Sequence, residues 1–320
     1  GIGSLFKNSI GSFNIGVGHQ PLWWNTIGQH NIAAGYNTLY SNSTGNSNIA
    51  VGSFALQFNT TGSNNMGIGY FALNKSSLGN DNIALGFGAM EENTTGNLNV
   101  AIGKSALKNN TTGSYNSCLG YNSYPIDTNL NNYSGIGFNV GSGSSTTNMV
   151  EIGNTSVGTI RGQTGFTVYS DGRIKKNIAE NVPGLEFITK LKPVTYYLDI
   201  HLQNEMIYGK EKPDTINWEG KYDIEKVLMS GFIAQDVEAA ANDINYDFNG
   251  VHKPKNSKDL YGLQYASFVV PLVKAIQEQQ TIIESQDQEI KALKTILTSI
   301  NHDIILLKSM VNKNAEVVKD

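Results

Sequence analysis

A glycine recurs every 17 residues along the first half of the chain, and this period constrains the fold more than any other feature. Five-residue units such as NIAVG and NIALG end in that glycine, and a second glycine lies seven residues before it. The first series comprises Gly18, Gly35, Gly52, Gly69, Gly86, Gly103, Gly120 and Gly137. A period kept this long is typical of a solenoid, in which each repeat packs only against its neighbours.

Each repeat is expected to form one thin rung of a rod. Ile49 and Val51 flank Ala50, an alternation that predicts a short strand with two different faces. The middle position stays small in every unit, so we expect something to pack closely against it. Seventeen residues suffice for about two strands and two turns, and rungs stacked at about 4.8 Å would give a rod of about 35–40 Å. So thin a rung leaves little interior, and we expect several chains, three in number, to share the core.

The asparagine that opens each unit is expected to form a ladder along the rod. Its members are Asn14, Asn31, Asn48, Asn65, Asn82, Asn99 and Asn116. Glycan or metal binding is the alternative, but no acidic residue recurs with them as a calcium repeat would need. We therefore expect neither a metal nor a cofactor. The lone cysteine, Cys118, occupies the small middle position and is expected to be a core residue.

Composition changes sharply near residue 170. Residues 1–169 hold 27 of the 34 glycines but only five Lys or Arg and five Asp or Glu, so the excess acid lies beyond them. A formal net charge of −4 provides no basic surface for nucleic acid. No apolar run approaches the ~20 residues of a membrane span, so no membrane insertion is expected. Because Gly1 lies inside a repeat, we expect further chain before it.

The C-terminal segment has a heptad pattern that never slips. The a positions 276, 283, 290, 297, 304 and 311 are Ile, Ile, Ile, Leu, Ile and Val; the d positions 272, 279, 286, 293, 300 and 307 are Leu, Gln, Gln, Leu, Ile and Leu. Apolar residues at this spacing predict a coiled coil over residues 271–313, with more than two strands. The alternative is a single amphipathic helix that docks on its own domain.

Four blocks in order resemble a known family: SDGRIKKNI (170–178), GLEFITKLKPVTYYL (184–198), GFIAQDVE (231–238) and YASFVVPLVKAIQEQQ (265–280). They are similar to the intramolecular chaperone and self-cleaving C-terminal domain of endosialidase-type phage tailspikes and tail fibres. The resemblance covers nearly all of residues 170–310. Residues 1–140 separately resemble the head repeats of trimeric bacterial adhesins, which form a parallel β-roll.

The chaperone resemblance implies a catalytic pair, with Ser170 as nucleophile and Lys175 as base. A serine hydroxyl needs a base, and lysine serves only when burial or neighbouring charge favours its neutral form. Arg173 and Lys176 would crowd Lys175 with like charge. Asp171 would orient the turn or balance the charge.

Attack by Ser170 on the carbonyl of Tyr169 passes through a five-membered ring. We therefore favour cleavage of the Tyr169–Ser170 bond, and the Ser170–Asp171 bond remains the alternative. Without the resemblance, the same letters would be read as a charged surface turn.

The predicted fold is a mainly β repeat rod, a trimeric parallel β-solenoid, followed by an α+β chaperone domain that ends in a long trimeric coiled-coil helix. The expected segments are 1–140 (repeats), 141–169 (β neck), 170–270 (self-cleaving chaperone), 271–313 (coiled coil) and 314–320 (tail).

These features predict a homotrimeric fibre or adhesin of a phage tail or bacterial surface, which binds a glycan or protein receptor on the host cell. Its chaperone domain would cut the chain once and leave. One alternative is a polysaccharide-degrading tailspike whose catalytic part lies upstream or at chain interfaces, where Asp81, Glu91, Glu92, Asp127 and Glu151 would meet. A membrane-bound regulator released by cleavage is a weaker alternative, since nothing in the sequence is typical of DNA binding or of a membrane span.

Overall fold

The computed structural model describes residues 1–125, 127–141, 146–209, 218–256 and 259–317, without the side chains of Tyr208 and of 311–317. The side chains of the predicted tail, 314–320, and of the heptad position 311 therefore fall outside those described. The chain forms two compact units. One holds residues 1–165, 196–229 and 254–260, and the other holds 166–195, 230–253 and 261–320.

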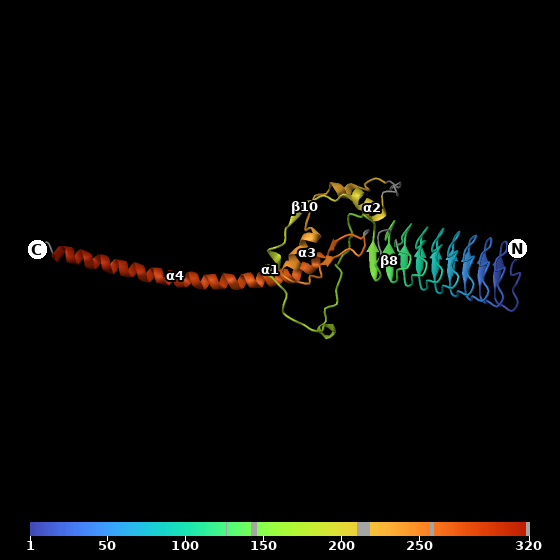
Figure 1. Ribbon diagram of the computed structural model, residues 1–320, viewed down its shortest axis with the longest axis horizontal. Helices are drawn as coiled ribbons and strands as arrows, with labels where there is room; N and C mark the ends of the chain where they lie inside the picture. The colour runs from blue at the N-terminus through green and yellow to red at the C-terminus, as the bar shows by residue number, and fades with distance from the viewer. Residues whose placement is uncertain (126, 142–145, 210–217, 257–258, 318–320) are drawn as a thin grey trace. The chain divides into compact units, whose positions relative to one another are not determined.

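The first unit is built on a parallel β-solenoid, which confirms the predicted fold class of the repeats (Figure 1). Its nine strands pair in chain order, with residue i beside residue i+17 over the first eight. They are β1 (Ile15–Val17), β2 (Ile32–Ala34), β3 (Ile49–Val51), β4 (Met66–Ile68), β5 (Ile83–Leu85), β6 (Val100–Ile102), β7 (Ser117–Leu119), β8 (Tyr133–Ile136) and β9 (Met149–Ile152). The expectation of two strands per repeat was wrong, because the second side of each rung is made of turns.

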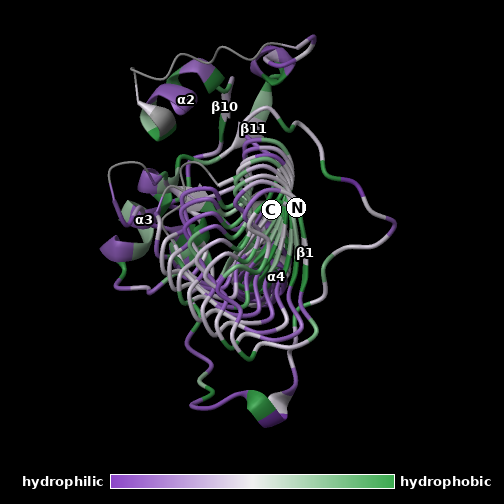
Figure 2. Ribbon diagram, turned by 90° about the vertical axis from the view of Figure 1, so that its right-hand side faces the viewer, coloured by the Kyte–Doolittle hydropathy of each residue, from purple (hydrophilic) through white to green (hydrophobic). Residues whose placement is uncertain are grey.

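The interior of the solenoid is filled by a single chain. The small middle residues, such as Ala50 and Ala84, point inward and are fully buried, as are the large residues four positions after the first six repeat glycines, from Leu22 to Leu107. A Cβ built on Gly67 would lie 3.4 Å from the side chain of Leu56, so only a small residue fits opposite these leucines. The expectation that several chains must share this core was therefore wrong. Figure 2 shows successive strands lying one behind another, with hydrophobic residues along them.

The two glycine series serve different purposes. Glycines that end the units, such as Gly52, have φ between 120° and 144°, a region that favours glycine. The second series has no positive φ; a Cβ on Gly45 would lie 2.3 Å from the carbonyl oxygen of Gly62 in the next rung. The second series therefore allows close stacking of rungs without a left-handed conformation, and the first series combines both, since a Cβ on Gly69 would lie 2.4 Å from Gly86 O. Non-glycine residues also turn the chain, since Leu56 and Asn64 are left-handed.

The predicted asparagine ladder is present, and a second buried ladder runs beside it. In the first, Asn48 Nδ2 donates to Asn31 Oδ1 at 3.1 Å and to Gly62 O at 2.8 Å. In the second, Asn59 Nδ2 donates to Asn42 Oδ1 at 2.7 Å. The second ladder comprises Asn8, Asn25, Asn42, Asn59, Asn93 and Asn110, with Ser76 in the place of a seventh asparagine. It has the same period of 17, but Ser76 interrupts the series of asparagines in the sequence.

Ser76 leaves a defect in this ladder. Its Oγ and the Oδ1 of Asn59 are buried and have no hydrogen-bond partner in the described structure. Ser76→Asn should restore the amide contacts to Asn59 and Asn93 and should raise the free energy of unfolding by about 1–3 kcal/mol. Denaturant unfolding measures the gain. Ser63→Asn is the matched control, because Ser63 Oγ already accepts from Asn46 N at 3.0 Å on an exposed edge. Equal midpoints for Ser76→Asn and wild type would contradict the assignment.

The last rung carries polar groups in its core. Glu151 of β9 pairs in register with Gly135, so it occupies the small inward position. The hydroxyl of Tyr133, which is fully buried, donates to Glu151 Oε2 at 2.5 Å. Cys118 is buried two rungs before Glu151, in β7, as predicted, and burial raises the pKa of its thiol to about 11. The C-terminal end of the solenoid is therefore the part of its core that responds to protonation.

We expect Glu151 to favour the folded rod at low pH. Burial raises the pKa of Glu151 above its ordinary value of 4.5, against the lowering effect of the Tyr133 bond, and the charge of Asp259 adds to the rise. Its stabilising contribution is present below about pH 4.5 and is lost as pH rises through the raised pKa. The thermal midpoint of Glu151→Gln minus that of wild type should therefore increase as the pH is raised. A difference that does not change with pH would contradict this.

The second unit is a small α+β core followed by a long helix. Phe187 of α1 (Leu185–Ile188) packs with Val237, Ala240 and Ala241 of α3 (Ala234–Asp243) and with Phe248 and Phe268. β12 (Val251–His252) and β13 (Gly262–Leu263) pair antiparallel, and η3 (Tyr265–Phe268) leads into α4. β10 (Val194–Tyr196) pairs with β11 (Met229–Gly231), and between them α2 (Ile200–Tyr208) and η2 (Asp223–Lys226) belong to the first unit.

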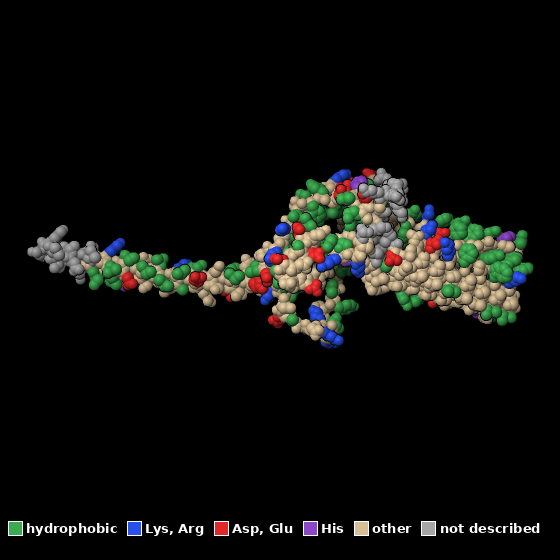
Figure 3. Space-filling view, in the orientation of Figure 1, with side chains coloured by type: hydrophobic (Ala, Val, Ile, Leu, Met, Phe, Trp, Pro, Cys, Tyr) green, Lys and Arg blue, Asp and Glu red, His purple; other side chains and the backbone are tan. Residues whose placement is uncertain are grey.

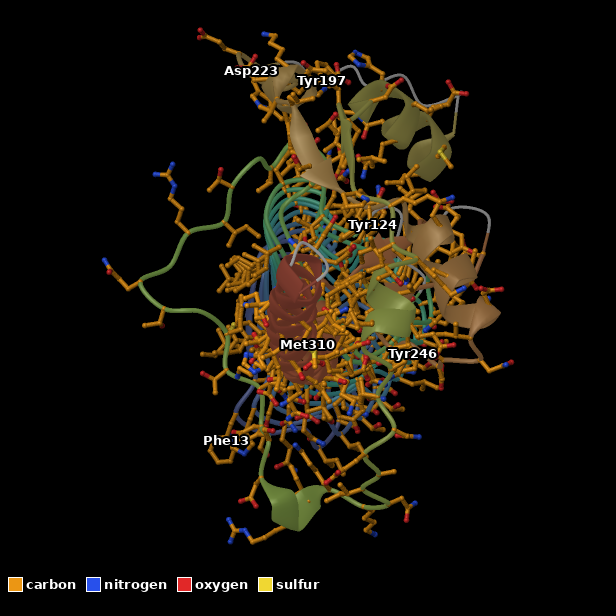
Figure 4. All side chains as sticks on the ribbon, turned by 90° about the vertical axis from the view of Figure 1, so that its left-hand side faces the viewer. Phe13, Tyr124, Tyr197, Asp223, Tyr246 and Met310 are labelled. Carbon is orange, nitrogen blue, oxygen red and sulfur yellow. The ribbon has the colours of Figure 1, made fainter. Side chains whose placement is uncertain are left out.

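Helix α4 (Val269–Val317) is continuous over 49 residues, which confirms the long C-terminal helix. Its a and d residues are exposed in the single chain, Ile283, Ile290 and Leu297 among them. Figure 3 shows hydrophobic side chains along its surface, and Met310 projects from it in Figure 4. Beyond its first turns the helix therefore presents an apolar stripe that the described residues of the same chain leave uncovered.

Candidate self-cleavage site

Residues 169–176, here called the release loop, bring the two predicted catalytic side chains together. The chain turns through η1 (Gly172–Ile174), where Ile174 N donates to Asp171 O and Lys175 N donates to Gly172 O. This turn returns Lys175 to the start of the loop. Its Nζ donates to Ser170 Oγ at 2.8 Å, the contact that proton transfer between the two groups requires.

Asp171 and Arg173 are bound to each other. The carboxylate of Asp171 accepts from Arg173 Nη2 at 2.5 Å and from Nε at 2.9 Å, and it also accepts from Arg173 N at 2.9 Å. The guanidinium lowers the pKa of the Asp171 carboxyl. The charge of Arg173 is therefore balanced at Asp171, whereas the sequence had suggested that it would crowd Lys175.

The release loop is fully exposed in the single chain. Tyr169, whose carbonyl is the expected target, has 91% of its surface accessible, and Phe166 has 95%. Every residue from 161 to 181 is exposed, Lys176 included. A base and nucleophile in open water lack the burial that activates a lysine. The pair is therefore assembled by local turn geometry, and none of the described residues of the single chain buries it.

A segment from the chaperone part of the sequence packs on the last rungs of the solenoid. Residues 196–229, here called the arm, belong to the same compact unit as the rod. Trp218 meets Phe138 edge-on with ring centroids 5.6 Å apart, and Thr155 Oγ1 donates to Asn204 Oδ1 at 2.7 Å. The sequence carries no signal for these contacts, because they join residues 49 or more positions apart.

The block GLEFI is seated directly on α4. Glu278 Oε2 accepts from Leu185 N at 2.8 Å and so caps α1. A Cβ on Gly184 would lie 2.7 Å from Ala275 N, so the helices meet too closely there for any side chain. This close contact with α4 explains why the first residue of GLEFI is a glycine.

The acidic side chains of the rod form ion pairs and hydrogen bonds within the rod. Glu91 pairs with Lys108 and Glu92 with Lys75, each across one rung, and Glu151 is bound to Tyr133. In the part of the chain that the structure describes, one group could hold a metal ion: Asp199, His201 and Glu225. Glu225 Oε1 already accepts from Ile200 N and His201 Nδ1, and Asp199 Oδ1 accepts from Leu202 N. These side chains therefore serve as the cap of α2.

Among the described residues, no helix combines the length and apolar character needed to cross a membrane. Searches of curated proteins and of solved structures found no match. A family model does match: residues 170–246 fit the peptidase S74 family, described as chaperone of endosialidase. The match opens at Ser170 and contains Lys175, α1, the arm and α3. The chain therefore joins an N-terminal parallel β-solenoid to a segment that matches the chaperone-of-endosialidase family model.

Proposed function

We propose that this chain is a homotrimeric fibre or adhesin, of a phage tail or bacterial surface, whose C-terminal part directs assembly and is then released by one self-cleavage. The observation that carries the proposal is the 2.8 Å contact between Lys175 Nζ and Ser170 Oγ, at the first residue of the family match. The rod would remain as the extracellular product and meet a glycan or protein on the host cell.

The proposed reaction is an acyl shift followed by hydrolysis. Neutral Lys175 takes the Ser170 hydroxyl proton while Oγ attacks the Tyr169 carbonyl carbon. The Tyr169–Ser170 C–N bond breaks as the lysine returns a proton to the Ser170 nitrogen, which leaves an ester on Oγ. Water then hydrolyses the ester to a Tyr169 carboxylate and a free Ser170 hydroxyl. No cofactor or metal enters this scheme.

Two apolar surfaces support a multichain assembly. The strand residues that flank the inward positions form an exposed face along the rod, here called the outer sheet face: Ile15, Val17, Ile32, Val51, Ile68, Ile83, Ile102, Leu119, Ile136, Val150 and Ile152. The a and d stripe of α4 is exposed as well. Contiguous apolar surface of this extent marks an interface, and the repeat of one face over nine strands favours copies of the same chain as its cover.

The heptad residues favour three chains. Isoleucine at most a positions, with further apolar residues at g such as Ile282 and Ile296, widens the stripe beyond what two helices bury. Assembly would also cover the exposed release loop and so favour the neutral lysine. Contacts of the arm with Phe138 and Thr155 would hold the last rungs in place while the others stack.

Denaturing electrophoresis of wild type beside Ser170→Ala tests the cleavage. The assembled wild-type chain should give two fragments, and the variant should stay intact. Wild type that remains whole after assembly overturns the proposal, and equal cutting of both assigns the cut to another protease. The intact masses of the fragments distinguish the Tyr169–Ser170 bond from Ser170–Asp171.

Native mass tests the assembly. Uncut Ser170→Ala should have the mass of three chains, and Ile68→Glu on the outer sheet face should weaken association because it buries a charge at the interface. Thr61→Glu is the matched control, since Thr61 is exposed on a turn of a neighbouring rung. A monomeric Ser170→Ala chain, or equal loss in both glutamate variants, would contradict the assignment of the outer sheet face.

A further inference from the structure

We propose that Asp171 and Arg173 are positioning residues of the release loop. Asp171 stabilises the turn that returns Lys175 to Ser170. Arg173 binds the Asp171 carboxylate, so that this carboxylate does not favour the protonated form of Lys175. The inference rests on the proposed self-cleavage and assigns roles to two residues beyond the catalytic pair.

The turn is the first requirement. Five residues in extended conformation would separate Ser170 from Lys175 by about 17 Å, whereas Nζ and Oγ lie 2.8 Å apart. The reversal occurs at η1, whose first residues are capped by Asp171 Oδ1 through the Arg173 N–H at 2.9 Å. A side-chain cap of this kind stabilises the local turn against the extended chain. Asp171 therefore acts on the catalytic pair through backbone geometry.

The charge is the second requirement. Asp171 directly follows Ser170, so a free carboxylate there would attract the lysine ammonium and favour the protonated form, which is not a base. Arg173 prevents this by binding the carboxylate through both Nε and Nη2. In the single chain residues 161–181 are all exposed, and the charged residues of the loop beside Lys175 are Asp171, Arg173 and Lys176.

The two roles predict different kinetic effects. Asp171→Ala removes the cap and should slow cleavage about 10-fold at every pH. Asp171→Asn keeps an oxygen for the Arg173 N–H and should retain the wild-type maximal rate to within about twofold. Arg173→Gln leaves the cap but frees the carboxylate, so the pH of half-maximal rate should rise by about one unit with the maximal rate unchanged. The double variant Asp171→Asn with Arg173→Gln should shift that pH back.

Full-length chains made by cell-free translation and moved into buffers of about pH 6 to 10 give these rates, with native mass as the check on assembly. Wild-type rates and pH profiles in both Asp171→Ala and Arg173→Gln would overturn the inference. So would an upward pH shift in Arg173→Gln that persists in the double variant. Uncut wild type, or cut Ser170→Ala, would instead overturn the proposed function itself.

Discussion

Lys175→Arg is expected to leave the chain uncut. Arginine keeps the positive charge and nearly the same reach, so it can still donate to Ser170 Oγ, but it does not lose its proton in a protein. The hydroxyl therefore has no base within the 2.8 Å distance that Lys175 Nζ occupies. Loss of a general base slows a reaction by about 100-fold or more. The fraction of intact chain on a denaturing gel, followed over time after assembly, measures the effect.

The adjacent lysine supplies the matched control. Lys176→Arg makes the same chemical change one residue further along the exposed loop and should be cut at the wild-type rate. Cutting of Lys175→Arg at that rate would remove Lys175 from the reaction. Slow cutting of both variants would show that the loop responds to any arginine, in which case the 2.8 Å contact has no special role.

Asn82→Asp is expected to destabilise the rod by about 3–5 kcal/mol. Asn82 is fully buried; its Nδ2 donates to Asn65 Oδ1 at 3.1 Å and to Gly96 O at 2.8 Å. A carboxylate has the same shape but donates nothing, so it would face two acceptors with a buried charge. The midpoint of denaturant unfolding reports the loss.

Asn80→Asp makes the same change two residues away. Asn80 belongs to the outer edge, where its Oδ1 accepts from Ser63 N at 2.8 Å, a bond that aspartate preserves, although its amide bonds to Leu78 O and Asn97 Oδ1 would be lost. The loss there should be below about 1 kcal/mol, because water reaches the side chain. Similar losses at both positions would mean that the buried ladder adds no more to stability than the exposed edge does.

Much of the rod followed from the sequence because its repeats are self-consistent. A period of 17 determined the first eight rungs, their in-register parallel pairing and the stacking of equal residues, the asparagines of the first ladder included, whereas β9 lies in the predicted neck and is off this period. The heptads likewise determined a long helix, since the 3–4 spacing of apolar residues needs no tertiary contact to be recognised. Local order of this kind is set by neighbours along the chain or along the stack.

The tertiary structure decided which side of each strand faces the core. Hydropathy alone would turn Ile49 and Val51 inward, yet Ala50 is the buried residue, because leucines such as Leu56 already fill the interior. Because the interior is full, the apolar flanking residues lie on the outer sheet face. An assembly is therefore expected from this exposed apolar face and not from an incomplete core. The rungs do not share one core between chains; each rung has its own core and also presents an apolar exterior.

In the release loop, too, the sequence determined some features and the tertiary structure determined others. Ser170 and Lys175 are candidates because four ordered blocks of the sequence resemble a family with a serine and a lysine at these positions. Only the folded turn shows Asp171 holding Arg173 and Lys175 reaching Ser170, because both contacts depend on the backbone reversal at η1. The contacts of Trp218 and Asn204 with the last rungs were equally out of reach, since they join residues that are distant in sequence and belong to no repeat.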